Sequence, residues 1–447
     1  MRYALATPHV AATEAGAAAM AAGGTAIDGA LAAAAVLAVA YPHMCALGGD
    51  AVALVRRPDG EVVVVNGTGA APAAADAGAV AARHAGRMPA TGPDTVTVPG
   101  VVAAWAAIAG LGARRGWAEL LAPAARLASD GVAIAPGLGR AIADQAAQLL
   151  RDPGLAAIFL PRGRPLRAGG VLRQPALART LDVLAAEGAG ALYRGSLADS
   201  FAAGLSALGV PIDPDDLASH ETELAPPLAG GFAGEEVLTS PPNTQGFVLL
   251  RMLDGLEPDA GDAELVRRFA AAAAERDATL GDPRAGAGDT VAVVAADEEG
   301  HAISLIQSVF ASFGAGLLEP ATGIVCHNRG AAFSLEPGPN RLAAGRRPAH
   351  TLMPVLTRRG GCLTGVHGTM GGQIQPLIHA QLLLRLAAGA AAQEAVAAPR
   401  AGPDGRRASG DAAGHAQVVR LRPGGGFDAG SDPRADGIAA CGDAPAG

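Results

Sequence analysis

The chain has 447 residues, more than the ~100–200 residues of an ordinary single domain, so we expect two modules or one large layered fold. Half of the residues are apolar and only 17% are charged, which excludes an intrinsically disordered chain. The formal net charge is −8 and no run of basic residues occurs, so neither nucleic acid nor a membrane surface is an expected partner. We expect a small-molecule partner instead.

All 34 positively charged side chains are Arg, because the sequence contains no Lys. Chemistry that needs a lysine amine, such as Schiff-base formation, pyridoxal-phosphate catalysis or a Walker phosphate loop, is therefore excluded. Cys45, Cys326, Cys362 and Cys441 are too far apart for a zinc motif, and we expect them to be reduced and buried. We therefore expect no cofactor and no bound metal.

The sequence also carries signals that bear on location in the cell. Its first ten residues lack the charged, apolar and small-residue regions of a signal peptide. The longest apolar run, Ala30 to Tyr41, is shorter than the ~18 residues that a membrane-spanning helix needs. A cytoplasmic protein is the resulting expectation.

The first elements in chain order are two helices. Ala15 to Ala22 favour a helix that Gly23-Gly24 ends. Thr25 is a typical N-cap for a second helix, which carries Asp28 in its first turn and ends at Pro42.

A pair of strands and a long helical region follow. Ala51 to Val55 and Glu61 to Val65 are predicted strands, joined by a turn that contains Pro58-Asp59-Gly60. Residues 100 to 280 are mostly helical in pattern, and we expect them to form an outer layer.

The pattern changes after residue 281. Gly286-Ala287-Gly288 predicts a flexible segment, after which Val291 to Ala296 and Ala302 to Phe310 predict the two buried strands of a hairpin. Further expected elements are strands at 323–326, 352–357 and 362–366, a helix at 375–388, a mobile linker at 401–414 and a last pair of strands. Strands between helical segments predict a layered α/β fold.

Two common hydrolase signatures are missing from the sequence. No Ser lies in a Gly-x-Ser-x-Gly elbow, and no pair of His residues has the spacing of a metal-binding helix. The glycine-rich segments at Gly48-Gly49-Asp50, 286–290 and 368–372 remain as candidates for a site, although each alone is more often a simple turn.

Short motifs along nearly the whole chain resemble, in the same order, those of the γ-glutamyltransferase family. Those of the first half include Gly23-Gly24-Thr25-Ala26-Ile27-Asp28, Gly48-Gly49, Ala71-Pro72 and Val98-Pro99-Gly100. Those of the second half include Gly288-Asp289-Thr290, Ser304-Leu305-Ile306-Gln307-Ser308, Phe313-Gly314, Arg347-Pro348, Gly371-Gly372 and Gly430-Ser431-Asp432-Pro433. On this resemblance the chain is identified as a member of the family.

The resemblance implies an α/β fold, the four-layer αββα sandwich of N-terminal-nucleophile hydrolases, made as a precursor that cuts itself before a Thr. That residue is Thr290 here, so residues 1–289 would form a large-subunit region and residues 290–447 a small-subunit region, and the two would stay associated. A new α-amine, with a pKa near ~8, can take the proton of its own hydroxyl during attack on an acyl carbon. On pattern alone, Thr290 would be an ordinary strand residue.

The resemblance also implies further roles around the nucleophile. Gly371 and Gly372 would present backbone N–H groups to the developing oxyanion, although the same segment also reads as a strand-to-helix turn. Ser308 matches the position where the family places a hydroxyl near the nucleophile, and without the resemblance it would be an ordinary strand serine.

Several positions differ from the family's transferases, which bind the α-carboxylate and the α-ammonium of a glutamyl group. The transferases have an Arg, an Asn, a Gln or Glu, an Asp and a Ser pair where this chain has Thr68-Gly69-Ala70, Phe310, Arg329, Ala332 and His350-Thr351. Most of the glutamyl-binding groups are therefore missing. Each lost charge-assisted contact is worth about 1.5–3 kcal/mol.

These differences, with the motif Pro241-Pro242-Asn243-Thr244-Gln245-Gly246, resemble the amidohydrolase branch of the family, which includes oxamate amidohydrolase-like proteins. Arg329 then becomes the expected anchor for a substrate carboxylate, unless it lies at the surface as most Arg residues do. Ser308, His350 and Thr351 are the other expected substrate-binding residues. The prediction is a self-processing amidohydrolase for a small acid amide. A true γ-glutamyltransferase or glutathione hydrolase, and an unprocessed binding protein, remain as alternatives.

Overall fold

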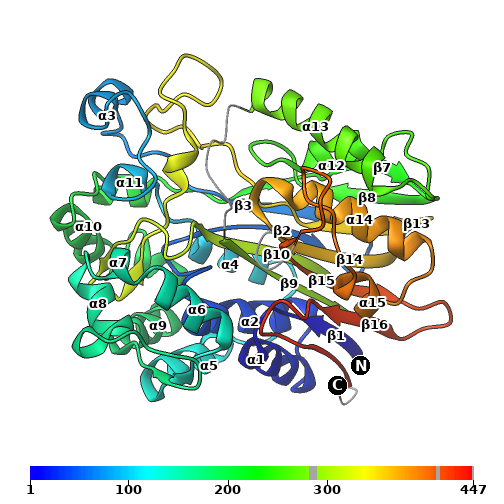
Figure 1. Ribbon diagram of the computed structural model, residues 1–447. Coiled ribbons are helices and arrows are strands. Elements are labelled where there is room, and N and C mark those ends of the chain that lie inside the picture. The colour runs from blue at the N-terminus through cyan, green and yellow to red at the C-terminus, as the bar shows by residue number, and fades with distance from the viewer. Residues whose placement is uncertain (281–288, 409–412, 445–447) are drawn as a thin grey trace.

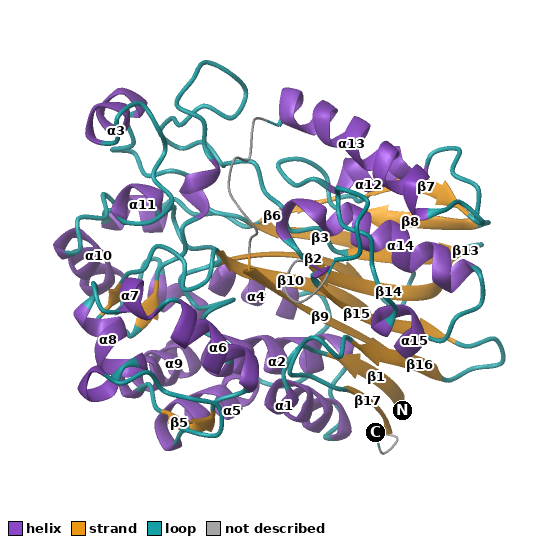
Figure 2. Ribbon diagram, in the orientation of Figure 1, coloured by secondary structure: helices purple, strands orange, loops and turns teal. Residues whose placement is uncertain are grey.

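The computed structural model describes residues 1–280, 289–408 and 413–444. Two antiparallel sheets lie face to face in the centre, and helices cover the outer face of each (Figure 1). The layers are therefore helix, sheet, sheet and helix, as the purple and orange ribbons of Figure 2 show. This arrangement confirms the predicted αββα sandwich.

The first central sheet contains the hairpin that was predicted to begin near Thr290. Within the described ranges it has seven strands in the order β17-β1-β9-β10-β2-β3-β6. Their bounds are β1 (Arg2–Ala6), β2 (Asp50–Arg56), β3 (Val62–Gly67), β6 (Glu223–Ala225), β9 (Asp289–Asp297), β10 (Ala302–Phe310) and β17 (Ala439–Asp443). Because β9 lies between β1 and β10, the start of β9 is in the middle of the sheet.

The second central sheet packs against the first. Counting only described residues, it has six strands in the order β16-β15-β14-β13-β8-β7. Their bounds are β7 (Leu228–Phe232), β8 (Glu235–Thr239), β13 (Val355–Arg359), β14 (Cys362–Met370), β15 (His415–Leu421) and β16 (Phe427–Ser431). Two short pairs lie outside both sheets, β4 (Val132–Ala133) with β5 (Val171–Leu172) and β11 (Leu318–Glu319) with β12 (Ile324–Val325).

One helical layer covers the first sheet, and a smaller one covers the second. The first layer and its surroundings comprise α1 (Val10–Ala21), α2 (Ala26–Ala40), α3 (Ala77–Arg83), α4 (Val101–Ala109), α5 (Trp117–Asp130), α6 (Pro136–Asp144), α7 (Ala146–Leu149), α8 (Pro153–Phe159), α9 (Pro175–Glu187), α10 (Ala198–Ala207) and α11 (Pro214–Ala218). The second comprises α12 (Gly246–Leu253), α13 (Asp262–Thr279), α14 (Gln375–Ala387) and α15 (Ala392–Ala397).

Apolar side chains fill the three spaces between the layers. Val294 and Ile306 of the first sheet meet Leu356 and Val366 of the second, which forms the central core. Every residue of α2 is buried, because the helix lies between the other face of the first sheet and the helices α1 and α5. Burial of apolar surface at ~25 cal/mol per Å² is the main force that holds such layers together.

Helix α2 begins where the sequence predicts. The Thr25 side chain accepts a hydrogen bond from the Ile27 N–H, and the Asp28 carboxylate accepts one from the Thr25 N–H at 2.7 Å. This reciprocal capping box satisfies backbone donors that the first helical turn leaves unpaired.

Three predictions about the fold are wrong. The region 100–280 does not form only an outer helical layer, because β8 pairs with β13 inside the second sheet. Three strands, and not two, follow residue 414 within the described range 413–444, and β17 crosses to the first sheet to pair with β1. Cys362 and Cys441 are exposed, whereas Cys45 and Cys326 are buried, and all four thiols are free.

Two further predictions concern residues that the structure does not describe. The flexible segment expected at Gly286-Ala287-Gly288 lies outside the described residues, as do residues 409–412 of the expected linker. Among the helices that are described, none combines the length and the apolar character that crossing a membrane requires.

Candidate active site

The hairpin of β9 and β10 brings Thr290 and Ser308 together. Gln307 pairs with Val291 and Phe310 pairs with Asp289, so two residues of β10 lie opposite Thr290 in a β-bulge. The Thr290 Oγ1 donates a hydrogen bond to the Ser308 Oγ at 3.4 Å. Both side chains are buried, with 1% and 2% exposure. The two hydroxyls that the resemblance selected therefore form one buried pair.

The β-bulge at Ser308 depends on an unusual backbone conformation at Phe310 and on the close approach of Gly49. Phe310 has a φ of 77°, in the left-handed region that a bulky residue rarely adopts, and its N–H donates to the Ser308 Oγ at 2.8 Å. A Cβ on Gly49 would lie 2.4 Å from the Ser308 carbonyl oxygen, so only glycine fits there. The loop before β2 and the bulge of β10 thus fix the position of Ser308.

Gly371 and Gly372 form the turn between β14 and α14, as the pattern predicts. Gly372 begins a short 3₁₀ helix, η5 (Gly372–Ile374), with a φ of 55° that favours glycine. The strand that leads to this turn packs on β9, since a Cβ on Gly368 would lie 2.7 Å from the Cβ of Ala292. The Gly371–Gly372 turn is therefore the continuation of a strand, β14, that contacts the strand of Thr290, β9.

Arg329 is not a surface residue. It begins a 3₁₀ helix, η4 (Arg329–Ala332), and is 1% exposed. Its guanidinium carbon lies 4.0 Å from the centre of the Phe310 ring, and its Nη2 donates to the Thr351 Oγ1 at 3.4 Å. Its Nε and Nη1 have no hydrogen-bond partner among the described residues. Burial lowers the pKa of Arg329 to about 9, against a raising influence of the Asp50 charge, so it stays positive at neutral pH.

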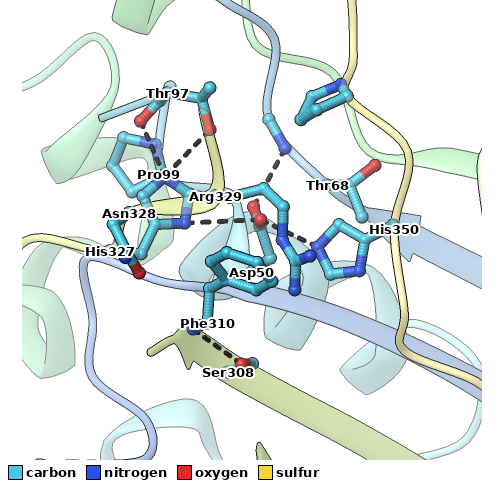
Figure 3. Close-up of polar contacts among 12 residues, drawn as sticks. Asp50, Thr68, Thr97, Pro99, Ser308, Phe310, His327, Asn328, Arg329 and His350 are labelled. Carbon is cyan, nitrogen blue, oxygen red and sulfur yellow. Dashed lines mark hydrogen bonds and ion pairs between the residues drawn. The ribbon is translucent and has the colours of Figure 1, made fainter. Parts of the chain in front are cut away.

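Asp50 lies at the centre of this group (Figure 3). Its Oδ2 is 3.0 Å from the His350 Nε2 and 3.3 Å from the His327 Nδ1, and its Oδ1 accepts the Gly69 N–H at 3.0 Å. Burial alone would raise the pKa of Asp50, but the two imidazoles lower it by a larger amount. The pKa of Asp50 therefore lies well below its usual range. Asp50 is therefore ionised at neutral pH.

His350 is neutral in this setting. Burial is the largest cause that lowers its pKa to about 4, and the positive charge of Arg329 adds to it. The His350 Nδ1 accepts the Leu352 N–H at 3.3 Å, which assigns the ring proton to Nε2 and lets that atom donate to Asp50. Burial and this hydrogen bond thus fix both the charge and the tautomer.

Pattern reasoning missed Asp50 and His327 as members of the site. The Gly48-Gly49-Asp50 segment stands out in the sequence for its glycines, although an acidic residue at the start of a buried strand is itself unusual. The His327 Nε2 also forms hydrogen bonds with Thr97, whose Oγ1 and carbonyl oxygen both lie 2.9 Å from it. No local pattern marks a histidine of this kind.

Two facing antiparallel sheets between helical layers, with a buried Thr at the start of a central strand, define the class: an N-terminal-nucleophile hydrolase fold. The Gamma-glutamyltranspeptidase family model matches residues 12–287 and 262–408. The chain belongs to this family. It is an enzyme of the amidohydrolase and acyltransferase kind.

Similar proteins cover nearly the whole chain. It is 34% identical to the oxamate amidohydrolase proenzyme of Klebsiella pneumoniae over 97% of either protein. It is 32% identical to the glutathione hydrolase-like YwrD proenzyme of Bacillus subtilis, over 88% of this chain and 83% of the relative. The crystal structure of a cephalosporin acylase from Bacillus halodurans superposes with a TM-score of 0.89 at 30% identity, over 98% of this chain and 95% of the acylase.

Proposed function

We propose that this chain cuts itself between Asp289 and Thr290, and that the product hydrolyses a small amide whose acyl group carries a carboxylate but no ammonium. Residues 1–289 and 290–447 would then be two chains of one enzyme. The names of both relatives above, each called a proenzyme, support the cleavage.

Cleavage would use the hydroxyl of Thr290. Its attack on the carbonyl carbon of Asp289 forms an ester while the peptide C–N bond breaks, and the Thr290 nitrogen takes up the hydroxyl proton and becomes a free amine. Water then hydrolyses the ester, which releases the Asp289 carboxylate and restores the Thr290 hydroxyl. The hydrogen bond from the Thr290 Oγ1 to the Ser308 Oγ supports a hydroxyl that is held in place beside a second polar atom. The freed α-amine can then act as the base for the same hydroxyl in each catalytic cycle.

The amide substrate would be attacked in the same way. The Thr290 oxygen bonds to the acyl carbon, the amine leaves with a proton, and water hydrolyses the acyl-enzyme. Backbone N–H groups of Gly371 and Gly372 would stabilise the oxyanion that forms at each step. The packing of β14 on β9 supports this role, because the turn follows directly on a strand that contacts the strand of Thr290.

The proposed substrate class rests on Arg329. The Nε and Nη1 atoms of its buried guanidinium have no partner in the described part of the chain, and a carboxylate offers two oxygens that match such donors. Ser308 would contact the acyl group near Thr290, and His350 and Thr351 would contact the substrate beside Arg329. A positively charged group next to Arg329 would be repelled by the guanidinium.

A γ-glutamyl group fits this site less well, because it brings an ammonium as well as a carboxylate. Asp50, a buried carboxylate whose charge acts on Arg329, already has both oxygens engaged by His350, His327 and the Gly69 N–H. An ammonium would therefore lose its pairing in the buried site, a cost of about 3 kcal/mol or roughly a hundredfold in specificity.

Two chromogenic amides test this proposal as a matched pair. Glutaryl-p-nitroanilide and γ-glutamyl-p-nitroanilide have the same length and carboxylate, and only the second has the α-ammonium. We expect the processed enzyme to hydrolyse the glutaryl compound with roughly a hundredfold higher kcat/KM. Ammonia release from oxamate measures the shorter substrate in the same preparation.

Variants of the anchor complete the test. Arg329→Ala is expected to raise KM for the glutaryl compound at least tenfold without preventing self-cleavage, and Arg329→Lys, which keeps the charge but not the planar donors, is the matched control. A clear preference for γ-glutamyl-p-nitroanilide or glutathione would reject the amidohydrolase assignment in favour of a γ-glutamyltransferase.

A further inference from the structure

We propose that Gln245 is a positioning residue that holds the Gly371–Gly372 turn at a fixed place relative to the segment that carries Thr351. This role rests on the proposed function, which gives the two segments their parts in substrate binding. Gln245 belongs to the Pro241–Gly246 motif, and no residue of this motif takes part in the reaction proposed above.

The amide of Gln245 joins the two segments directly. Gln245 lies at the N-terminus of α12 and is 1% exposed. Its Nε2 donates to the carbonyl oxygen of Thr351 at 3.0 Å and to the carbonyl oxygen of Gly372 at 2.8 Å. Its Oε1 accepts a hydrogen bond from the Arg276 Nη1 at 3.0 Å. Both N–H groups and the oxygen of the side chain are therefore used.

These bonds fix the backbone on either side of the Gly372 Cα. The Gly371 carbonyl oxygen accepts the Ile374 N–H at 3.1 Å, which orients the peptide plane that contains the Gly372 N–H. The bond from Gln245 orients the next peptide plane. Gly372 has a φ of 55°, but a glycine can adopt many other backbone conformations at little cost. Hydrogen bonds from other residues must therefore hold the Gly372 N–H in the direction of an oxyanion.

Arg276 in turn holds Gln245. It lies on α13, is 4% exposed, and also donates from Nη1 to the Gln373 carbonyl oxygen at 3.3 Å. Gln245 and Arg276 are in the proposed large-subunit region, whereas Thr351 and Gly372 are in the small one. The turn that would bind the oxyanion is therefore positioned by residues on the other side of the proposed cleavage.

The rest of the motif supports the same segment. The Asn243 carbonyl oxygen accepts the His350 N–H at 2.8 Å, and the Asn243 Nδ2 donates to the Pro348 carbonyl oxygen at 2.8 Å. Residues 348–351 are thus tied to the motif along their length. Gln245 extends this contact to the Gly371–Gly372 turn.

Gln245→Leu tests the role, with Gln381→Leu as the matched control. Gln381 is 2% exposed and also donates from Nε2 to two carbonyl oxygens, of Leu377 and Ala401, while it accepts the Ala401 N–H. The assay uses whichever of oxamate, glutaryl-p-nitroanilide and glutathione the wild-type enzyme hydrolyses fastest. A failure of the substrate assignment therefore does not affect this test.

We expect Gln245→Leu to lower kcat about tenfold to a hundredfold while KM changes less than about threefold, because the turn is displaced and the anchor remains. Gln381→Leu should lower the melting temperature but leave kcat unchanged. Gln245→Glu keeps the size and can pair with Arg276, but its carboxylate cannot donate, so it should lose kcat as Gln245→Leu does even if the leucine variant folds poorly.

A double-mutant cycle separates a shared role from two independent ones. Arg276→Met should lower kcat about threefold to tenfold, and the Arg276→Met/Gln245→Leu double variant should be no worse than Gln245→Leu alone, because both act through one contact. Unchanged kcat in processed Gln245→Leu or Gln245→Glu would overturn the role. An equal loss of kcat in Gln381→Leu would do so too.

Discussion

At the scale of the residue, Asp50 organises side chains from distant parts of the chain. It meets the Gly69 N–H, His327 and His350, and 300 positions separate it from His350. Thr290 and Ser308 could be selected from the sequence because family motifs surround them. Asp50 and His327 could not, since their roles depend on contacts that only the folded sheet creates.

Replacement of Asp50 by Asn is expected to destabilise the fold. Asn keeps the size but turns an NH₂ group toward at least one N–H donor and removes the negative charge, and breaking one partner of a buried charged network costs about 3–5 kcal/mol. We expect Asp50→Asn to lower the free energy of unfolding by about 3 kcal/mol in urea titrations of the uncleaved Thr290→Ala chain.

A control for this variant is Asp59→Asn in the same background. Asp59 forms an exposed ion pair with Arg57, and such pairs are worth about 0–1 kcal/mol. A loss of less than 1 kcal/mol for Asp50→Asn would show that Asp50 does not hold the network together.

At the scale of the element, local signals were sufficient for helices and insufficient for the second sheet. The start of α2 follows from Thr25 and Asp28, three residues apart, because a capping box is a local structure. Strand β8 was missed because it is short, lies in a mostly helical region, and pairs with β13 more than 100 positions later. Pairing at that distance is set by packing, which no window of sequence contains.

The turn after β14 carries the second prediction. Gly372→Ala is expected to leave the protein folded and processed, because a left-handed Ala costs only ~1 kcal/mol. We expect kcat to fall about 10²-fold, since a Cβ beside the acyl carbon would displace the backbone donor. The measurement is steady-state kinetics on the preferred substrate after mass spectrometry has verified processing. Normal kcat in the fully processed variant would remove Gly372 from the oxyanion site.

At the scale of the whole molecule, buried histidines in different layers predict sensitivity to acid. Burial lowers the pKa of His43 to about 3, of His350 to about 4 and of His379 to about 3, with smaller electrostatic contributions from nearby groups. The unfolded chain, in which a histidine has a pKa of ~6.5, binds protons before the folded chain does. The stability is therefore complete above about pH 6.5 and is lost as the pH falls toward 4.

Thermal unfolding between pH 7.5 and 5 tests this prediction. Each such histidine contributes a slope of up to about 1.4 kcal/mol per pH unit below its unfolded pKa, so the melting temperature should fall steeply in this range. His379→Gln should reduce the slope, because one proton-binding site of the unfolded chain is removed. A melting temperature that stays constant from pH 7.5 to 5 would contradict the prediction.

The central claim is that Thr290 becomes an N-terminal nucleophile, and intact-mass spectrometry of the freshly purified protein tests it most directly. The wild-type chain should give two masses, those of residues 1–289 and of residues 290–447, and the smaller chain should begin with Thr290. Thr290→Ala should give one uncut chain, and Thr290→Ser partial cleavage at the same bond. A wild-type chain that stays intact, or Thr290→Ala cut at that bond, would contradict the account.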